Sequence, residues 1–222
     1  MTRPIAAAAL AAALAIPALA AEPEGPSFDC AKASNRAEKT ICDVPELAWQ
    51  DRQMGKAYKV ALAAVGKSGE ADLKAGQKAF LKKRDACPAG DGIYQCISSA
   101  YDSRLAKLAE IVDAADFDAA RFTGETGSLA LVRYPDARVA LSILTFGGGD
   151  HTCSFETDSA KVSRSGVVTW SANPDPELYG GKCTLTLTPA GTGLILVSDG
   201  EACQYYCGMR ATLDGTFERE TP

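Results

Sequence analysis

The chain has 222 residues, 8 cysteines and a formal net charge of −5 at pH 7. This mild acidity argues against a nucleic-acid partner, because phosphate contacts require clustered lysine and arginine side chains. It permits electrostatic attraction to a basic protein.

Residues 1–21 are typical of a secretory signal peptide. Arg3 precedes an uncharged, alanine-rich run, and Ala18-Leu19-Ala20 supplies the small residues that signal peptidase recognises. The run is short for a membrane span, and no cysteine follows it for lipid attachment. We therefore predict cleavage, a periplasmic or secreted protein with no membrane anchor after cleavage, and a net charge of −6 instead of −5 through loss of Arg3. The alternative is an uncleaved N-terminal anchor.

Residues 27–112 are expected to form a small all-α bundle. A short helix ends near Cys42, because Asn35 and Glu38 have the spacing of a capping box. Apolar residues then recur every three or four positions over residues 45–65, with Gly66 as a stop. Similar spacing predicts helices over residues 70–86 and 93–112, which gives an up-down-up arrangement.

Residues 127–220 are expected to form an all-β domain. Short runs rich in valine, isoleucine and threonine are separated by turn signals such as Ser165-Gly166 and Gly147-Gly148-Gly149-Asp150. Residues 183–188 alternate, with Cys and Leu on one face and Thr on the other. The pattern predicts an antiparallel barrel or sandwich.

The cysteines divide evenly between the two parts, and in an exported protein they indicate disulfides. They are Cys30, Cys42, Cys87 and Cys96, followed by Cys153, Cys183, Cys203 and Cys207. In the helical part we favour the local pairs Cys30–Cys42 and Cys87–Cys96, and the alternative is Cys42–Cys87 with Cys30–Cys96. In the β part the strand pattern favours Cys183–Cys203 and Cys153–Cys207.

The sequence predicts no catalytic residue, no metal and no cofactor. His151 is the single histidine, so a serine hydrolase would have to use it, and no Gly-x-Ser-x-Gly elbow is present. His151 with Cys153, Cys203 and Cys207 could bind zinc, but an oxidising compartment favours disulfides. We predict a protein that is not an enzyme.

The segment from Asn173 to Lys182 is the candidate partner-contact loop. It contains two prolines together with Asp175, Glu177, Tyr179 and Lys182. Tyrosine is a frequent contact residue at interfaces, and prolines reduce the entropy lost on binding. The alternative is an ordinary long hairpin loop.

Residues 27–110 closely resemble the N-terminal domain of the LprI-type lysozyme inhibitors. The matching positions are Phe28-Asp29-Cys30, Glu38, Ile41, Cys42, Leu47, Asp51, Tyr58, Gln77, Arg84-Asp85, Cys87, Cys96, Tyr101 and Arg104. Phe80 replaces the tryptophan that is usual in the family. The resemblance implies an exported helical domain associated with lysozyme inhibition, although the pattern assigns no inhibitory residue.

The β part is similar to the MliC-type lysozyme inhibitors only in its small, disulfide-bearing β form and its Ser165-Gly166 turn. Residues 165–170 lack that family's Ser-Gly-x-x-Tyr pattern. The function we predict is an exported binding protein that inhibits lysozyme or a related cell-wall hydrolase. The alternative is an envelope structural or adhesion module that binds peptidoglycan or another protein without inhibiting.

Overall fold

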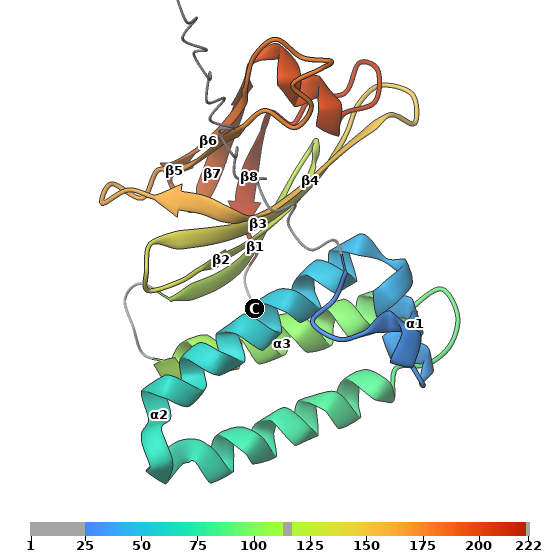
Figure 1. The fold of residues 1–222 in the computed structure, drawn as a ribbon, viewed down its shortest axis with the longest axis vertical. Coiled ribbons are helices and arrows are strands. Elements are labelled where there is room, and N and C mark those ends of the chain that lie inside the picture. The colour runs from blue at the N-terminus through green and yellow to red at the C-terminus, as the bar shows by residue number, and fades with distance from the viewer. Residues whose placement is uncertain (1–24, 113–116, 221–222) are drawn as a thin grey trace, which may run out of the picture.

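A computed structural model describes residues 25–112 and 117–220, which form a helical part and a β-barrel (Figure 1). The predicted signal peptide, residues 1–21, lies outside the described residues. Both parts of the fold-class prediction are confirmed: disulfide-stapled helices come first, and a closed antiparallel barrel of eight strands follows. No helix in the described ranges is long and apolar enough to cross a membrane.

The helical part contains a 3-10 helix and three α-helices. They are η1 (Cys30–Lys32), α1 (Arg36–Asp43), α2 (Pro45–Asp85) and α3 (Ile93–Val112). Gly66 divides α2 into two helices, because its φ of 60° and ψ of −163° are not helical. The chain reverses there (Figure 1), and the two halves lie side by side, since Gln77 Nε2 donates to Met54 Sδ at 3.0 Å. The predicted stop at Gly66 is therefore confirmed.

The barrel follows chain order, and β8 closes it against β1. Its strands are β1 (Asp118–Gly124), β2 (Gly127–Arg133), β3 (Arg138–Phe146), β4 (Thr152–Val162), β5 (Val168–Ala172), β6 (Cys183–Ala190), β7 (Gly193–Asp199) and β8 (Gly215–Arg219). The barrel thus begins before residue 127, because β1 precedes that position. Alternate side chains fill the interior, among them Leu141, Ile143 and Phe155, each 1% exposed or less.

Each part contains two disulfides. The helical part has Cys30–Cys42 and Cys87–Cys96. The barrel has Cys153–Cys207 and Cys183–Cys203, which attach β4 and β6 to η2 (Glu201–Tyr206) and the residue after it. These are the pairs that the sequence favours. They also leave no sulfur at these positions free to bind zinc.

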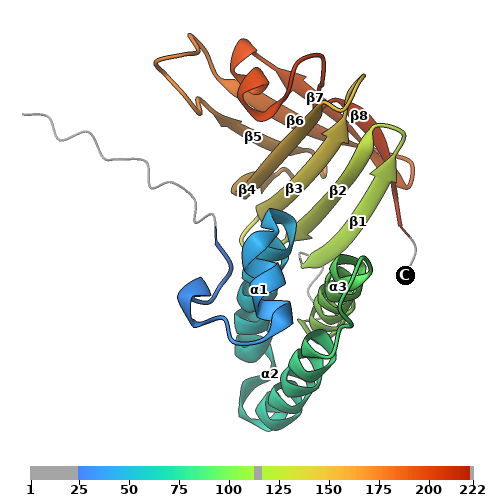
Figure 2. The same ribbon diagram turned by 90° about the vertical axis from the view of Figure 1, so that its right-hand side faces the viewer.

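The helices pack on the outer face of β1 to β4 (Figure 2). Val132 and Tyr134 of the barrel join the same buried apolar cluster as Trp49 of α2. Polar contacts border this cluster: Arg52 Nη2 lies 3.1 Å from Glu156 Oε2, and Gln53 Nε2 donates to Asp158 Oδ1 at 2.5 Å. The two parts therefore share one interface, and neither can be removed without exposing apolar surface of the other.

Candidate functional site

The polar residues of the LprI-like pattern form a buried hydrogen-bond network inside the helical bundle. The Tyr101 hydroxyl donates to Asp51 Oδ1 at 2.7 Å. Arg84 Nη1 donates to the same hydroxyl at 3.4 Å, and Arg84 Nη2 lies 2.7 Å from Asp85 Oδ1. Burial, reinforced by the neighbouring Asp51 carboxylate, raises the pKa of Tyr101. Tyr101 is therefore a neutral hydrogen-bond donor that joins α2 to α3.

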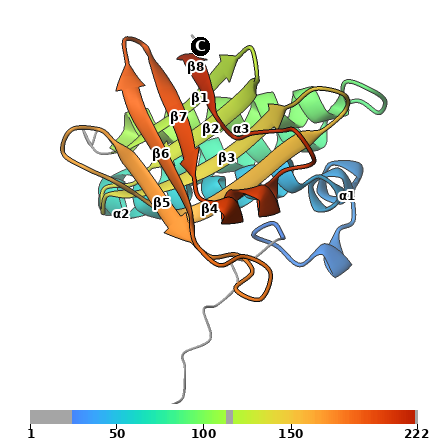
Figure 3. The same cartoon turned by 90° about the horizontal axis from the view of Figure 1, so that it is seen from above.

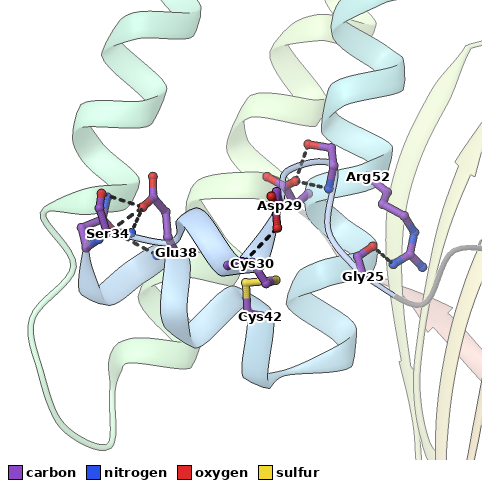
Figure 4. Close-up of a disulfide and its surroundings, with 11 residues drawn as sticks. Gly25, Asp29, Cys30, Ser34, Glu38, Cys42 and Arg52 are labelled. Atoms are coloured by element: carbon purple, nitrogen blue, oxygen red, sulfur yellow. Dashed lines mark hydrogen bonds between the residues drawn. A yellow bond between two sulfur atoms is a disulfide. The ribbon is translucent and has the colours of Figure 1, made fainter.

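The same network fixes the N-terminal segment (Figure 4). Asp51 Oδ2 accepts from the Ser27 backbone N–H at 2.8 Å. Glu38 Oε2 accepts from the backbone N–H groups of Ser34 at 2.7 Å and Asn35 at 3.2 Å, and these bonds lower the pKa of Glu38. The Cys30–Cys42 disulfide then joins this segment to the end of α1.

Arg104 of α3 joins that helix to α2 by two further hydrogen bonds. Its Nε donates to Gln77 Oε1 at 3.0 Å and its Nη2 to the Leu73 carbonyl at 3.2 Å. Arg84 and Arg104 are each 5% exposed. A buried polar group that already has partners cannot bind another protein without losing them. The buried polar residues of the pattern therefore account for the fold of the bundle and are not themselves available to contact a partner.

The predicted contact loop, residues 173–182, is held in shape by its own polar groups. Asp175 Oδ1 accepts from the backbone N–H groups of Glu177 and Leu178, at 3.1 Å each. Asn173 Nδ2 donates to the Tyr179 carbonyl at 3.0 Å. Asp175 is thus occupied in stabilising the turn, whereas Glu177 and Lys182 are exposed.

In this loop the side chain exposed to solvent is that of Leu178, and the neighbouring Tyr179 is partly buried. Tyr179 is half-buried and packs against the barrel core, so it is not the exposed contact residue that the sequence suggests. Leu178 is 69% exposed and is the apolar side chain that this loop presents to solvent. Sequence reasoning missed Leu178, because irregular backbone has no fixed period from which the direction of a side chain can be read.

The four most exposed large apolar side chains of the described residues lie at one end of the barrel. They are Met209 (72%), Leu178 (69%), Phe146 (57%) and Tyr205 (53%). We call this end the barrel-end surface and define it as residues 146–151, 173–182 and 200–214. The loop between β5 and β6 lies beside η2 in two views (Figures 1 and 3), so separate segments of the chain contribute to one surface.

Disulfides and ring packing hold much of the barrel-end surface against the strands. Both barrel disulfides fix η2 and the segment after it to the strands. Tyr206 packs edge-on against Phe155 at 5.0 Å and Trp170 at 5.9 Å between ring centroids. Gly147 lies so close to Ala211 that an added Cβ would be 2.7 Å from the Ala211 Cα. A surface held in this way loses little conformational entropy when it binds a partner.

The barrel-end surface is acidic. It carries five acidic residues against two basic ones, a formal balance of −3; they are Asp150, Asp175, Glu177, Glu201 and Asp214, with Lys182 and Arg210. His151 is half-buried beside Gly208. No group of three or more possible metal ligands occurs in the part of the chain that the structure describes. Exposed apolar side chains within an acidic surface suit contact with a basic protein.

Comparisons with known proteins connect the helical part to one family. Residues 30–108 match the model of the family described as lysozyme inhibitor LprI, which confirms the resemblance for this part of the chain. Proteins named lipoprotein LprI from Mycobacterium bovis and Mycobacterium tuberculosis are each 32% identical over 108 residues. The alignment covers 45% of this chain and 53% of each relative, so the chain spans about half the length of the curated relatives it matches. No solved structure matches the chain.

Proposed function

We propose that this chain is an exported protein that binds and inhibits lysozyme or a related cell-wall hydrolase. The match of residues 30–108 to the LprI lysozyme inhibitor family carries the proposal. The four disulfides support it, because structural disulfides persist in an oxidising compartment outside the cytoplasm. We further propose that cleavage near residue 21 releases a mature chain of residues 22–222, periplasmic or secreted, which acts by binding and catalyses no reaction.

The barrel-end surface is the contact region that we propose. A lysozyme cleft contains two carboxyl groups that flank the bond to be cleaved. The loop of residues 173–182 can enter such a cleft with Leu178 against its apolar wall and the Lys182 ammonium donating to a carboxylate. The surrounding acidic residues would speed the approach of a basic enzyme. Tyr179 would not contact the enzyme itself but would keep the loop packed on the barrel.

The test of this proposal measures inhibition of a c-type lysozyme by full mature chains that differ by one exposed side chain. Leu178→Ser should raise the inhibition constant about tenfold or more, as expected for a central apolar contact. Ile111→Ser is the matched control, because Ile111 is a 39% exposed apolar residue on α3, away from the barrel end. The pair Lys182→Ala and Lys107→Ala tests the charge in the same way.

The outcomes separate the function from the contact surface. If Leu178→Ser and Lys182→Ala inhibit as the unmodified chain does, the proposed contact surface is wrong although the inhibitor function stands. If the unmodified chain inhibits no lysozyme but cosediments with purified cell wall, the function is wrong and a peptidoglycan-binding module replaces it. The whole chain has to be used, because removing the barrel would expose the apolar cluster around Trp49 and Val132.

A further inference from the structure

The second half of α2, residues 67–85, forms the layer of the molecule that lies farthest from the barrel. It runs along the bottom of Figure 1, whereas the first half of α2 and α3 lie between it and the barrel. Its inner face is buried through Leu73, Phe80 and Arg84, so its opposite face is open to solvent. The barrel-end surface, with η2, lies at the other end of the longest axis (Figure 1). These two surfaces can therefore meet different partners at the same time.

Four lysines lie along the exposed face of this helix half. Positions three or four residues apart share one face of a helix, and the spacing here places the lysines within about 100° of arc. We call this face the lysine strip and define it by six exposed residues: Lys67, Ala71, Lys74, Ala75, Lys78 and Lys82. Its two alanines are too short to keep an opposing surface away from the ammonium groups. The strip extends over about 22 Å, because an α-helix rises about 1.5 Å per residue.

Neighbouring carboxylates do not cancel the positive charge of the lysine strip. Lys74 pairs with Glu70 at its margin, and Asp85, at the end of the helix, lies 2.7 Å from the buried Arg84. Asp72 is the remaining acidic residue of this helix half, and helical geometry turns it roughly 100° away from the middle of the strip. The other three lysines form no ion pair with any residue that the structure describes; they are Lys67, Lys78 and Lys82.

The charges of the whole molecule are divided between its two ends. Residues 25–112 carry 14 basic and 11 acidic side chains, a formal balance of +3. Residues 117–220 carry 8 basic and 13 acidic side chains, a formal balance of −5. An anionic surface would therefore attract the helical end and repel the barrel end, which orients the molecule. In about 0.1 M salt the Debye length is about 10 Å, so the barrel charges are screened more than lysines at contact.

A flat anionic partner fits the lysine strip. Clusters of basic residues along one face of a helix bind anionic lipid headgroups. Nucleic-acid bases need exposed aromatic side chains on which to stack, and the one aromatic residue of residues 67–85, Phe80, is buried. We propose that the lysine strip binds the protein reversibly to a membrane surface rich in anionic phospholipid headgroups, with the barrel-end surface facing away. This contact is electrostatic and does not rest on lysozyme inhibition.

Cosedimentation with lipid vesicles tests the proposal on the oxidised chain of residues 22–222. Vesicles of equal parts phosphatidylcholine and phosphatidylglycerol are the anionic probe, and vesicles of phosphatidylcholine alone are the neutral probe. In about 0.1 M salt the chain should sediment with the anionic vesicles and not with the neutral ones. About 0.5 M salt should release it, because screening weakens contacts between exposed charges.

Lys78→Gln combined with Lys82→Gln should lower the partition coefficient for anionic vesicles about 30-fold, since each lysine at such a surface contributes about fivefold. Lys161→Gln combined with Arg164→Gln is the matched control, because it removes the same charge from exposed positions at the end of β4 and in the turn after it. The control should change binding less than about twofold. All four side chains are exposed, so both variants should keep the circular dichroism spectrum of the unmodified chain.

The proposal is overturned if the unmodified chain does not bind anionic vesicles in about 0.1 M salt, or if the strip variant and its control lose binding equally. Sedimentation with purified cell wall but not with vesicles would also overturn it, because the anionic partner would then be a polymer. Leu178→Ser, at the barrel-end surface, should bind vesicles as the unmodified chain does. The membrane contact and the proposed lysozyme contact can therefore fail independently.

Discussion

Glu156 makes the interface between the helices and the barrel sensitive to pH. Burial raises its pKa from 4.5 to about 7, against the opposing effect of Arg52, and the nearby carboxylates of Glu46 and Asp158 act in the same direction as burial. Its Oε2 accepts from Arg52 Nη2 at 3.1 Å, whereas its Oε1 has no hydrogen-bond donor among the described residues. The folded protein therefore binds a proton at Glu156 under conditions in which the unfolded chain has released it.

The direction of the change in stability with pH follows from the linkage between proton binding and folding. Because the pKa is higher in the folded state, the stability contributed by this group is present below pH 4.5 and is lost as the pH rises through about 7. A shift of this size corresponds to about 3 kcal/mol. Glu156→Gln replaces the titrating carboxyl by a neutral amide of similar shape. The unfolding free energy of the unmodified chain minus that of the variant should fall by about 3 kcal/mol between pH 4 and pH 8.

Urea denaturation of both chains, with all disulfides intact, measures this difference at each pH. Glu177→Gln, at an exposed loop carboxyl, is the control, and its difference in unfolding free energy from the unmodified chain should not fall between pH 4 and pH 8. A difference for Glu156→Gln that stays constant across the same pH range would show that the carboxyl is not driven to protonate by burial, and the reasoning would fail.

Three further predictions concern the stability of the fold and the order of the barrel end. Tyr101→Phe leaves the buried Asp51 without its hydroxyl donor and should lower the free energy of unfolding by roughly 1–3 kcal/mol. Tyr205→Phe, on the surface, should lower it little, and urea denaturation of both variants measures the difference. Gly66→Ala places a side chain at φ 60°, ψ −163° and should destabilise the folded protein by roughly 1–3 kcal/mol. Gly92→Ala is the control and should be tolerated, because Gly92 has open space around it and no positive φ. Equal thermal unfolding temperatures for the two variants would contradict this. Replacing Cys183 and Cys203 together by serine should loosen η2 and raise amide hydrogen exchange in residues 200–207, with helical residues 93–112 as the internal control. Unchanged exchange would contradict this and show that Cys153–Cys207 and the packing of Tyr206 hold this end without the second disulfide.

Local patterns in the sequence were sufficient to predict most of the individual elements. Gly66 interrupts a run with helical spacing, and the structure places the reversal of α2 there. The alternation of residues 183–188 matches β6, where Cys183, Leu185 and Leu187 face the core. The start of the barrel was less clear, because β1 contains Ala119 and Ala120, which do not mark an inner and an outer face.

Contacts between distant parts of the chain could not be predicted from local patterns. Gln53 and Asp158 meet across 105 residues, and no spacing rule connects them. The candidate loop illustrates the same limit on a smaller scale. Its position was suggested by its prolines and charges, but which of Leu178 and Tyr179 faces solvent depends on packing against the barrel core.

The central claim is that the protein inhibits lysozyme, and one titration tests it most directly. The turnover of a cell-wall suspension by c-type lysozyme is measured with increasing amounts of the oxidised chain of residues 22–222. The proposal predicts that activity falls in proportion to added protein and is abolished near equimolar concentration. Full activity at micromolar excess, with g-type and i-type lysozymes equally unaffected, would contradict it.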